Sequence, residues 1–100
     1  METMETESAS KRKAKCQIYN ALAAVQDRMP AVTGRVSRKG VPHLVGTLPS
    51  GRRYSICYFK RHRGYTVFFP YGEFKEQEKV RASTPAEVEG AVERLVSEHA

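Results

Sequence analysis

The chain has 100 residues and a mass of 11.3 kDa, which is the size of one typical domain. It carries 17 Lys and Arg against 11 Asp and Glu, a formal net charge of +6, and 40% of its residues are hydrophobic. No apolar run reaches the roughly 18 residues of a membrane span, and no signal segment begins the chain. These figures exclude a large enzyme, a membrane protein and a disulfide scaffold. They predict a cytoplasmic protein, or a nuclear one in a eukaryotic host.

The positive charge is concentrated in the middle of the chain. Residues 28–72 contain no Asp or Glu, whereas the residues after position 82 hold four Glu and a single Arg. A second basic group, Lys11, Arg12, Lys13 and Lys15, lies near the N-terminus. This asymmetry predicts one face that attracts anions. The basic residues of the middle segment are Arg28, Arg35, Arg38, Lys39, Arg52, Arg53, Lys60, Arg61 and Arg63.

Helical periodicity appears first. Residues 1–9 have no apolar stripe, so we expect a disordered tail followed by one domain over residues 10–100. A helix is predicted over residues 10–28, and Pro30 ends it because the residue before a proline is pushed out of the helical region. The stripe that predicts this helix consists of Ala14, Ile18, Leu22, Val25 and Met29.

From residue 32 the apolar period changes to two, which is typical of β-strands. In the fourth strand we expect Tyr65, Val67, Phe69 and Tyr71 on one face, with Pro70 at a sheet edge or outside the ladder. The predicted strands cover residues 32–36, 41–48, 52–60 and 65–71, with a candidate fifth strand over 79–82. Turn signals separate them at 39–40, 49–51 and 62–64.

A second helix ends the chain. Thr84 and Glu87 have the spacing of a capping box, and Pro85 fits the first helical position. Its apolar stripe consists of Val88, Ala91, Val92, Leu95 and Val96. The predicted fold is therefore α+β, with an antiparallel meander of about four strands between an N-terminal and a C-terminal helix. Both helices pack on one face of the sheet.

Basic turns and tyrosines form the candidate site. Alternate turns of a meander lie at the same end of the sheet, so the turns near residues 39 and 62 are expected to converge. Most aromatic residues suit the core, but tyrosines tolerate water and are the better candidates for stacking on bases. The candidate anion-binding residues are Arg38, Lys39, Arg52, Arg53, Lys60, Arg61, His62, Arg63, Tyr54, Tyr58 and Tyr65.

Two functions fit this pattern. The first is a nucleic-acid-binding module whose basic sheet end contacts phosphates of DNA or RNA. The second is a small inhibitor or modulator, for example one encoded by a mobile element, that docks its cationic face on an acidic protein. Neither involves a membrane, and the sequence does not distinguish between these partners or define an oligomeric state.

Parts of the sequence resemble known nucleic-acid-binding domains. Arg63, Gly64 and Tyr65 are similar to the start of the RNA-contacting strand motif of RNA-recognition-motif domains, from which Thr66, Val67 and Pro70 depart. The order helix, antiparallel strands, helix is similar to that of double-stranded-RNA-binding domains. Those domains have a lysine-rich start to their last helix, where residues 83–87 here are acidic. The layout is also similar to plant AP2-type and phage-integrase arm-binding domains. No family is identified.

Catalytic and metal-binding patterns are sparse. Asp27 is the single Asp, and the three His are far apart in sequence. Cys16 and Cys57 form no Cys-x-x-Cys motif and are expected to be free thiols. A Cys57–His43 pair across adjacent strands is the one candidate for nucleophilic chemistry. We predict that the protein is not an enzyme and needs no cofactor or metal.

Overall fold

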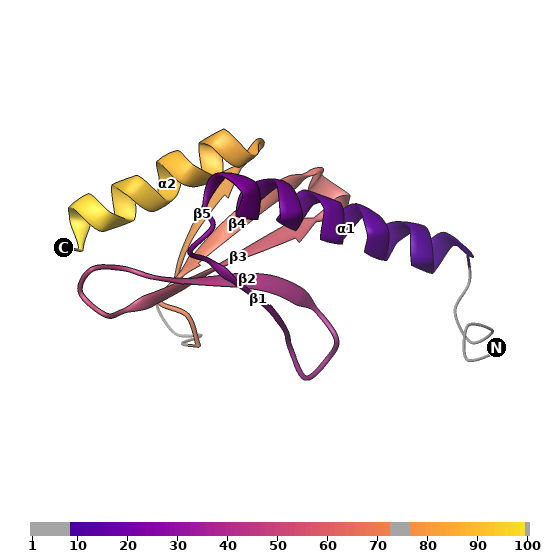
Figure 1. The fold of residues 1–100 in the computed structure, drawn as a ribbon, viewed down its shortest axis with the longest axis horizontal. Coiled ribbons are helices and arrows are strands. Elements are labelled where there is room, and N and C mark those ends of the chain that lie inside the picture. Colours follow the sequence, from indigo (N-terminus) through magenta and orange to yellow (C-terminus); the bar gives the residue numbers. More distant parts are fainter. Residues whose placement is uncertain (1–8, 73–76, 100) are drawn as a thin grey trace.

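The computed structural model describes residues 9–72 and 77–99, with the backbone alone for residues 9–15. It is an α+β fold in which the chain forms a helix, an antiparallel five-stranded sheet and a second helix (Figure 1). The predicted tail lies outside the described residues except for Ala9, which begins the first helix. In chain order the elements are α1 (Ala9–Arg28), β1 (Thr33–Val36), β2 (Pro42–Thr47), β3 (Arg53–Phe59), the 3-10 turn η2 (Lys60–His62), β4 (Gly64–Phe69), β5 (Glu78–Ala82) and α2 (Pro85–Glu98).

The sheet is a meander. Its strands lie in the order β1-β2-β3-β4-β5, and each pairs antiparallel with the next. We predicted about four strands and named residues 79–82 as a candidate fifth. The structure makes β5 a full strand that pairs along β4, from Glu78 opposite Phe69 to Ala82 opposite Tyr65.

Both helices cover the same face of the sheet (Figure 1). The N-terminal helix α1 packs on β2 and β3, while α2 packs on β4 and β5 and also against α1. Ile56 and Val67, on neighbouring strands, point into this layer and are fully buried. Burying an aliphatic side chain of this size contributes about 1.5–3 kcal/mol. The core therefore lies between the helices and one face of the sheet. No helix of the described residues is long and apolar enough to cross a membrane.

The start of α2 has the predicted cap. The Oγ1 of Thr84 accepts a hydrogen bond from the N–H of Glu87 at 3.2 Å, and Glu87 in turn accepts from the N–H of Ser83 at 2.8 Å. An ion pair of 3.1 Å between Arg28 and Glu89 joins α1 to α2. Because this pair is partly exposed, it contributes at most about 1 kcal/mol.

Tyr71 lies on the opposite face from the one predicted. Strand β4 ends at Phe69, because Pro70 has no N–H with which to extend the ladder. The backbone N–H of Tyr71 then donates to the Arg53 carbonyl at 2.8 Å. Its hydroxyl lies 3.3 Å from Nε2 of His43, whose side chain points away from the helices. Tyr71 therefore folds back over the face that the helices leave free.

A close approach between β2 and β3 explains why position 46 is a glycine. Gly46 lies opposite Tyr54, whose buried ring occupies the space above the glycine. A Cβ at position 46 would overlap atoms of this ring. In contrast, no described atom lies within 4 Å of a Cβ added at Gly90, in the middle of α2.

Gly46→Ala should lower the free energy of unfolding by about 1–3 kcal/mol, because the added methyl forces the Tyr54 ring out of place. Gly90→Ala should raise it by up to about 1 kcal/mol, because alanine is the better helix former. Urea denaturation of both variants measures the two effects. Equal stability of Gly46→Ala and the wild type would contradict the close packing of Gly46 against Tyr54.

Candidate nucleic-acid interface

The sheet face away from the helices presents alternate residues of every strand. Its members follow from the strand register, since paired residues point to the same side. We term this surface the open face. Across the strands from β1 to β5, one row is Arg35, His43, Cys57, Thr66 and Arg81, and the next row is Thr33, Val45, Ser55, Phe68 and Lys79. Arg53 and Phe59 belong to the same face of β3.

Basic side chains lie at both edges of the open face. Arg35 is on the β1 edge, and Lys79 and Arg81 are on the β5 edge, all exposed. Between them, the guanidinium carbon of Arg53 lies 5.4 Å from the centre of the Tyr71 ring, within cation–π range. A polyanion that crosses the open face therefore meets positive charge at both edges and near its middle.

Aromatic rings form the centre of the same face. The rings of Phe59 and Phe68, on neighbouring strands, have their centres 6.3 Å apart in an edge-to-face arrangement. The His62 ring is 6.2 Å from that of Phe59. Phe59 is 38% exposed although it is a large apolar residue. The open face thus has an aromatic centre between basic edges.

A groove of about 550 Å³ runs beside Tyr71, between it and the β1–β2 hairpin. Arg35 and Arg38 line one part of it, and Cys57 and Phe68 line another. The groove therefore offers positive and apolar walls side by side.

His43 fixes one wall of this groove. Its Nδ1 lies 3.1 Å from the carbonyl of Val41, which can only accept, so Nδ1 carries the proton. Its Nε2 then accepts from the hydroxyl of Tyr71. Both nitrogens of the buried ring therefore have a partner, and His43 holds Tyr71 over the open face.

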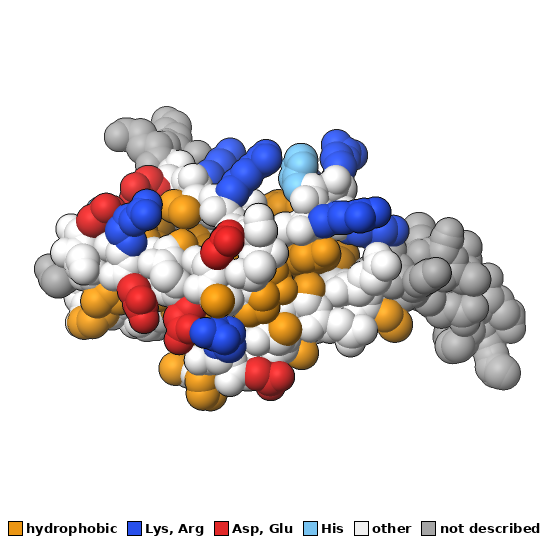
Figure 2. Space-filling model, turned by 90° about the horizontal axis from the view of Figure 1, so that it is seen from above, with side chains coloured by type: hydrophobic (Ala, Val, Ile, Leu, Met, Phe, Trp, Pro, Cys, Tyr) orange, Lys and Arg blue, Asp and Glu red, His pale blue; other side chains and the backbone are white. Residues whose placement is uncertain are grey.

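Negative charge lies in the helix layer. The described carboxylates belong to Asp27 on α1, to the four Glu of α2, and to Glu78 on the helix-facing side of β5. Figure 2 looks down on the helices and shows most red side chains on the half that contains α2. A group of blue side chains with one histidine lies on the other half (Figure 2). Seen from the helix side, the described part of the molecule is therefore more negative over α2 and more positive on the other half.

The structure separates the two basic turns that we expected to converge. Both lie at the same end of the sheet, but the β1–β2 turn points away from the helices while the chain after β3 packs beside α1 (Figure 1). Arg38 lines the groove of the open face, and Lys39 is exposed in the same turn. A different hollow of about 600 Å³ is lined by Lys60, Arg61, Arg63 and Tyr58, with Gln17 and Asn20 of α1.

Two of the predicted tyrosines are in the core. Tyr54 and Tyr65 are 4% and 5% exposed, and burial raises the pKa of both phenols. The Tyr65 hydroxyl donates to the Ala21 carbonyl of α1 at 3.0 Å. Tyr58 is partly buried with its ring 5.1 Å from that of Tyr65. Because these residues share the phase of Ile56, they face the helices, and Tyr54 and Tyr65 cannot stack on a ligand.

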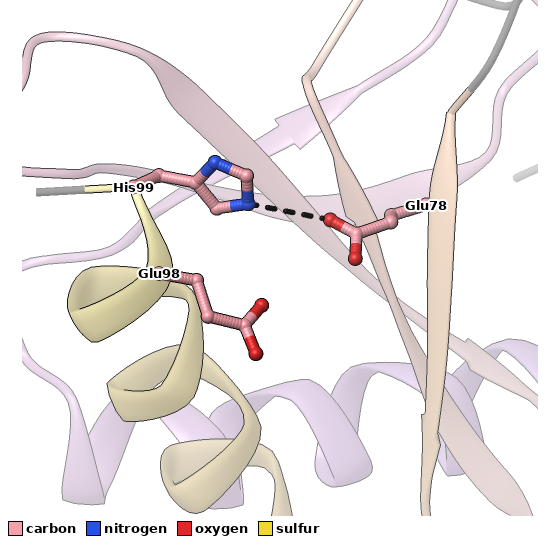
Figure 3. Close-up of side chains that lie close together, drawn as sticks. All are labelled: Glu78, Glu98 and His99. Atoms are coloured by element: carbon pink, nitrogen blue, oxygen red, sulfur yellow. Dashed lines mark ion pairs between the residues drawn. The ribbon is translucent and has the colours of Figure 1, made fainter.

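A cluster that the sequence did not indicate joins α2 to β5. His99 Nε2 lies 3.4 Å from a carboxylate oxygen of Glu78, and Glu98 lies beside them (Figure 3). The His99 ring packs 4.6 Å from the Phe69 ring, and the predicted site residue Arg52 lies 4.8 Å from the same ring. Ligand atoms of Glu78, Glu98 and His99 lie within 4.8 Å of one another, so these residue types could hold a cation. The contact brings the end of α2 next to β5 and is an ion pair only when the imidazole of His99 is protonated.

Comparison with protein families, with curated proteins and with solved structures gave no match.

The Cys57 thiol is not activated. Burial raises its pKa to about 11, whereas a reactive cysteine needs a lowered pKa. Its neighbour across the strands, His43, already uses both ring nitrogens. The arrangement does not supply the thiolate that a Cys57–His43 nucleophile would need.

Iodoacetamide should therefore alkylate Cys57 at least about tenfold more slowly than the exposed Cys16 at about pH 8, where roughly 0.1% of a thiol with a pKa of about 11 is ionised. The rate at Cys57 should keep rising as the pH approaches 11. Mass spectrometry of peptides over a time course separates the two sites. Equal rates at about pH 8 would contradict the burial of Cys57.

Proposed function

We propose that the protein binds nucleic acid through the open face. The observation that carries this proposal is the arrangement of Phe59 and Phe68 between basic edges, with Arg35 on one side and Lys79 and Arg81 on the other. Nucleic acids offer both matching features, since they combine a line of phosphates with flat aromatic bases.

Electrostatics favour this orientation of the protein. The described carboxylates lie on the helices or on the helix-facing side of β5, so they are away from a polyanion on the open face. Arg38 extends the positive surface at one end of the groove. Lys60, Arg61 and Arg63 add a separate positive surface at the end of the sheet, in the hollow beside α1. Phosphate contacts with these residues would release counterions, and affinity would fall steeply with salt.

An acidic protein is the alternative partner. Its carboxylates would pair with the same basic edges and would also give a salt-dependent complex. The aromatic centre favours nucleic acid over this alternative, because the exposed Phe59 ring and the half-buried Phe68 ring lie between cationic edges, as bases lie between phosphates. Purification with and without nuclease separates the two partners.

The double variant Arg35→Gln/Arg81→Gln should weaken binding to a labelled oligonucleotide. On single strands, each lost phosphate contact should lower the slope of log K against log salt by about 0.7, so the slope should fall by about 1.4. Fluorescence anisotropy over a salt series measures the slope.

Arg94→Gln is the matched control, because Arg94 is exposed on α2, on the other side of the molecule. It should leave the slope unchanged. The proposal fails if the wild type binds neither single- nor double-stranded DNA or RNA at low salt. It also fails if the double variant behaves as Arg94→Gln does.

A further inference from the structure

We infer that the open face selects single-stranded over double-stranded nucleic acid, with Phe59 and Phe68 as the residues on which bases stack. This inference rests on the proposed function. It names the substrate class of the same site, and three features of the open face support it.

The first feature is the width of the face. Five strands spaced by about 4.8 Å make a surface about 19 Å across. The major groove of B-form DNA is about 12 Å wide and admits a helix or a two-stranded ribbon. The open face is too broad to enter that groove with both of its basic edges. A duplex could only rest on the face through its backbone, leaving the aromatic centre unused.

The second feature is the exposed aromatic centre. Phe59 is 38% exposed, and its ring lies 6.3 Å from that of Phe68 and 6.2 Å from that of His62. Bases in a duplex already stack on each other, so their faces are unavailable. Unpaired bases can place a face on an aromatic side chain, as they do in single-strand-binding proteins. An exposed phenylalanine at this position suits an unpaired base.

The third feature is the groove beside the rings. It begins at Phe68 and continues to Arg35 and Arg38, and its volume of about 550 Å³ is in the range of sites for small organic ligands. If a base of a nucleic-acid strand stacks on Phe68, the phosphates of that strand would lie near these two guanidinium groups.

A second copy of the chain is a poorer occupant for this face. In a face-to-face dimer, basic residues such as Arg35, Lys79 and Arg81 of both copies would be brought together, and like charges repel. The charge of the open face instead complements a polyanion.

The test compares a labelled single strand with a hairpin duplex of the same sequence by fluorescence anisotropy at fixed salt. The wild type should bind the single strand at least about tenfold more tightly. Phe59→Ala should weaken single-strand binding about tenfold and change duplex binding little, because it removes a stacking surface and no charge. Phe59→Tyr should retain binding, because the ring is kept.

Tyr19→Ala is the matched control, since Tyr19 is a 51% exposed aromatic residue on α1. It should bind as the wild type does, and circular dichroism should show that each variant is folded. Phe59→Leu keeps an apolar side chain without a ring and should lose binding as Phe59→Ala does.

The outcomes separate the two proposals. Equal affinity for the single strand and the duplex would overturn the single-strand inference, and so would a Phe59→Ala variant that binds the single strand as tightly as the wild type. The proposed function would stand in either case if Arg35→Gln/Arg81→Gln still weakens binding. Absence of binding to either form would overturn both.

Discussion

The two-residue period of the strands, together with the placement of both helices on one side, determines what each side chain of the sheet can do. Residues of the central strands in phase with Ile56 meet the helices and belong to the core, whereas Val36 and Glu78 on the edge strands are exposed. Residues in phase with Phe59 do not meet a helix. A single register therefore divides the sheet into a face that packs on the helices and a face with basic residues on its edge strands and Phe59 and Phe68 between them. The groove, the aromatic centre and the basic edges all follow from that division.

The elements could be predicted from the sequence, since their signals are local. Pro30 and the Thr84 cap mark the helix ends, and short turns impose the meander. The sequence could not predict which face of the sheet the helices cover, because this depends on the path of the two connections that join the helices to the sheet. Tyrosine was preferred over phenylalanine at the surface for its hydroxyl, but the phase of β3 places Tyr54 inside and Phe59 outside. The alternation of β3 therefore determines which aromatic residues are exposed, and the polarity of the side chain does not.

The charge distribution shows the same limit. The sequence predicted a positive middle segment. The structure places Arg35, Arg38 and Arg53 of this segment on the open face or in its groove, and Lys60, Arg61 and Arg63 beside α1. We expected the turns near residues 39 and 62 to converge because we treated the meander as a flat sheet. Strands in a sheet twist, so turns two strands apart point in different directions, and Arg38 joins the groove while Arg61 lies beside α1.

The charged residues on the two edge strands of this sheet have a second consequence. Edge strands of a sheet carry unpaired backbone groups that can pair with a neighbouring molecule, and charged side chains there discourage such pairing. Here Arg35 stands on one edge strand and Lys79 and Arg81 on the other. The residues that we propose for an anionic ligand would therefore also discourage edge-to-edge pairing between copies of the chain. Selection for ligand affinity and selection against edge-to-edge aggregation would act on the same positions.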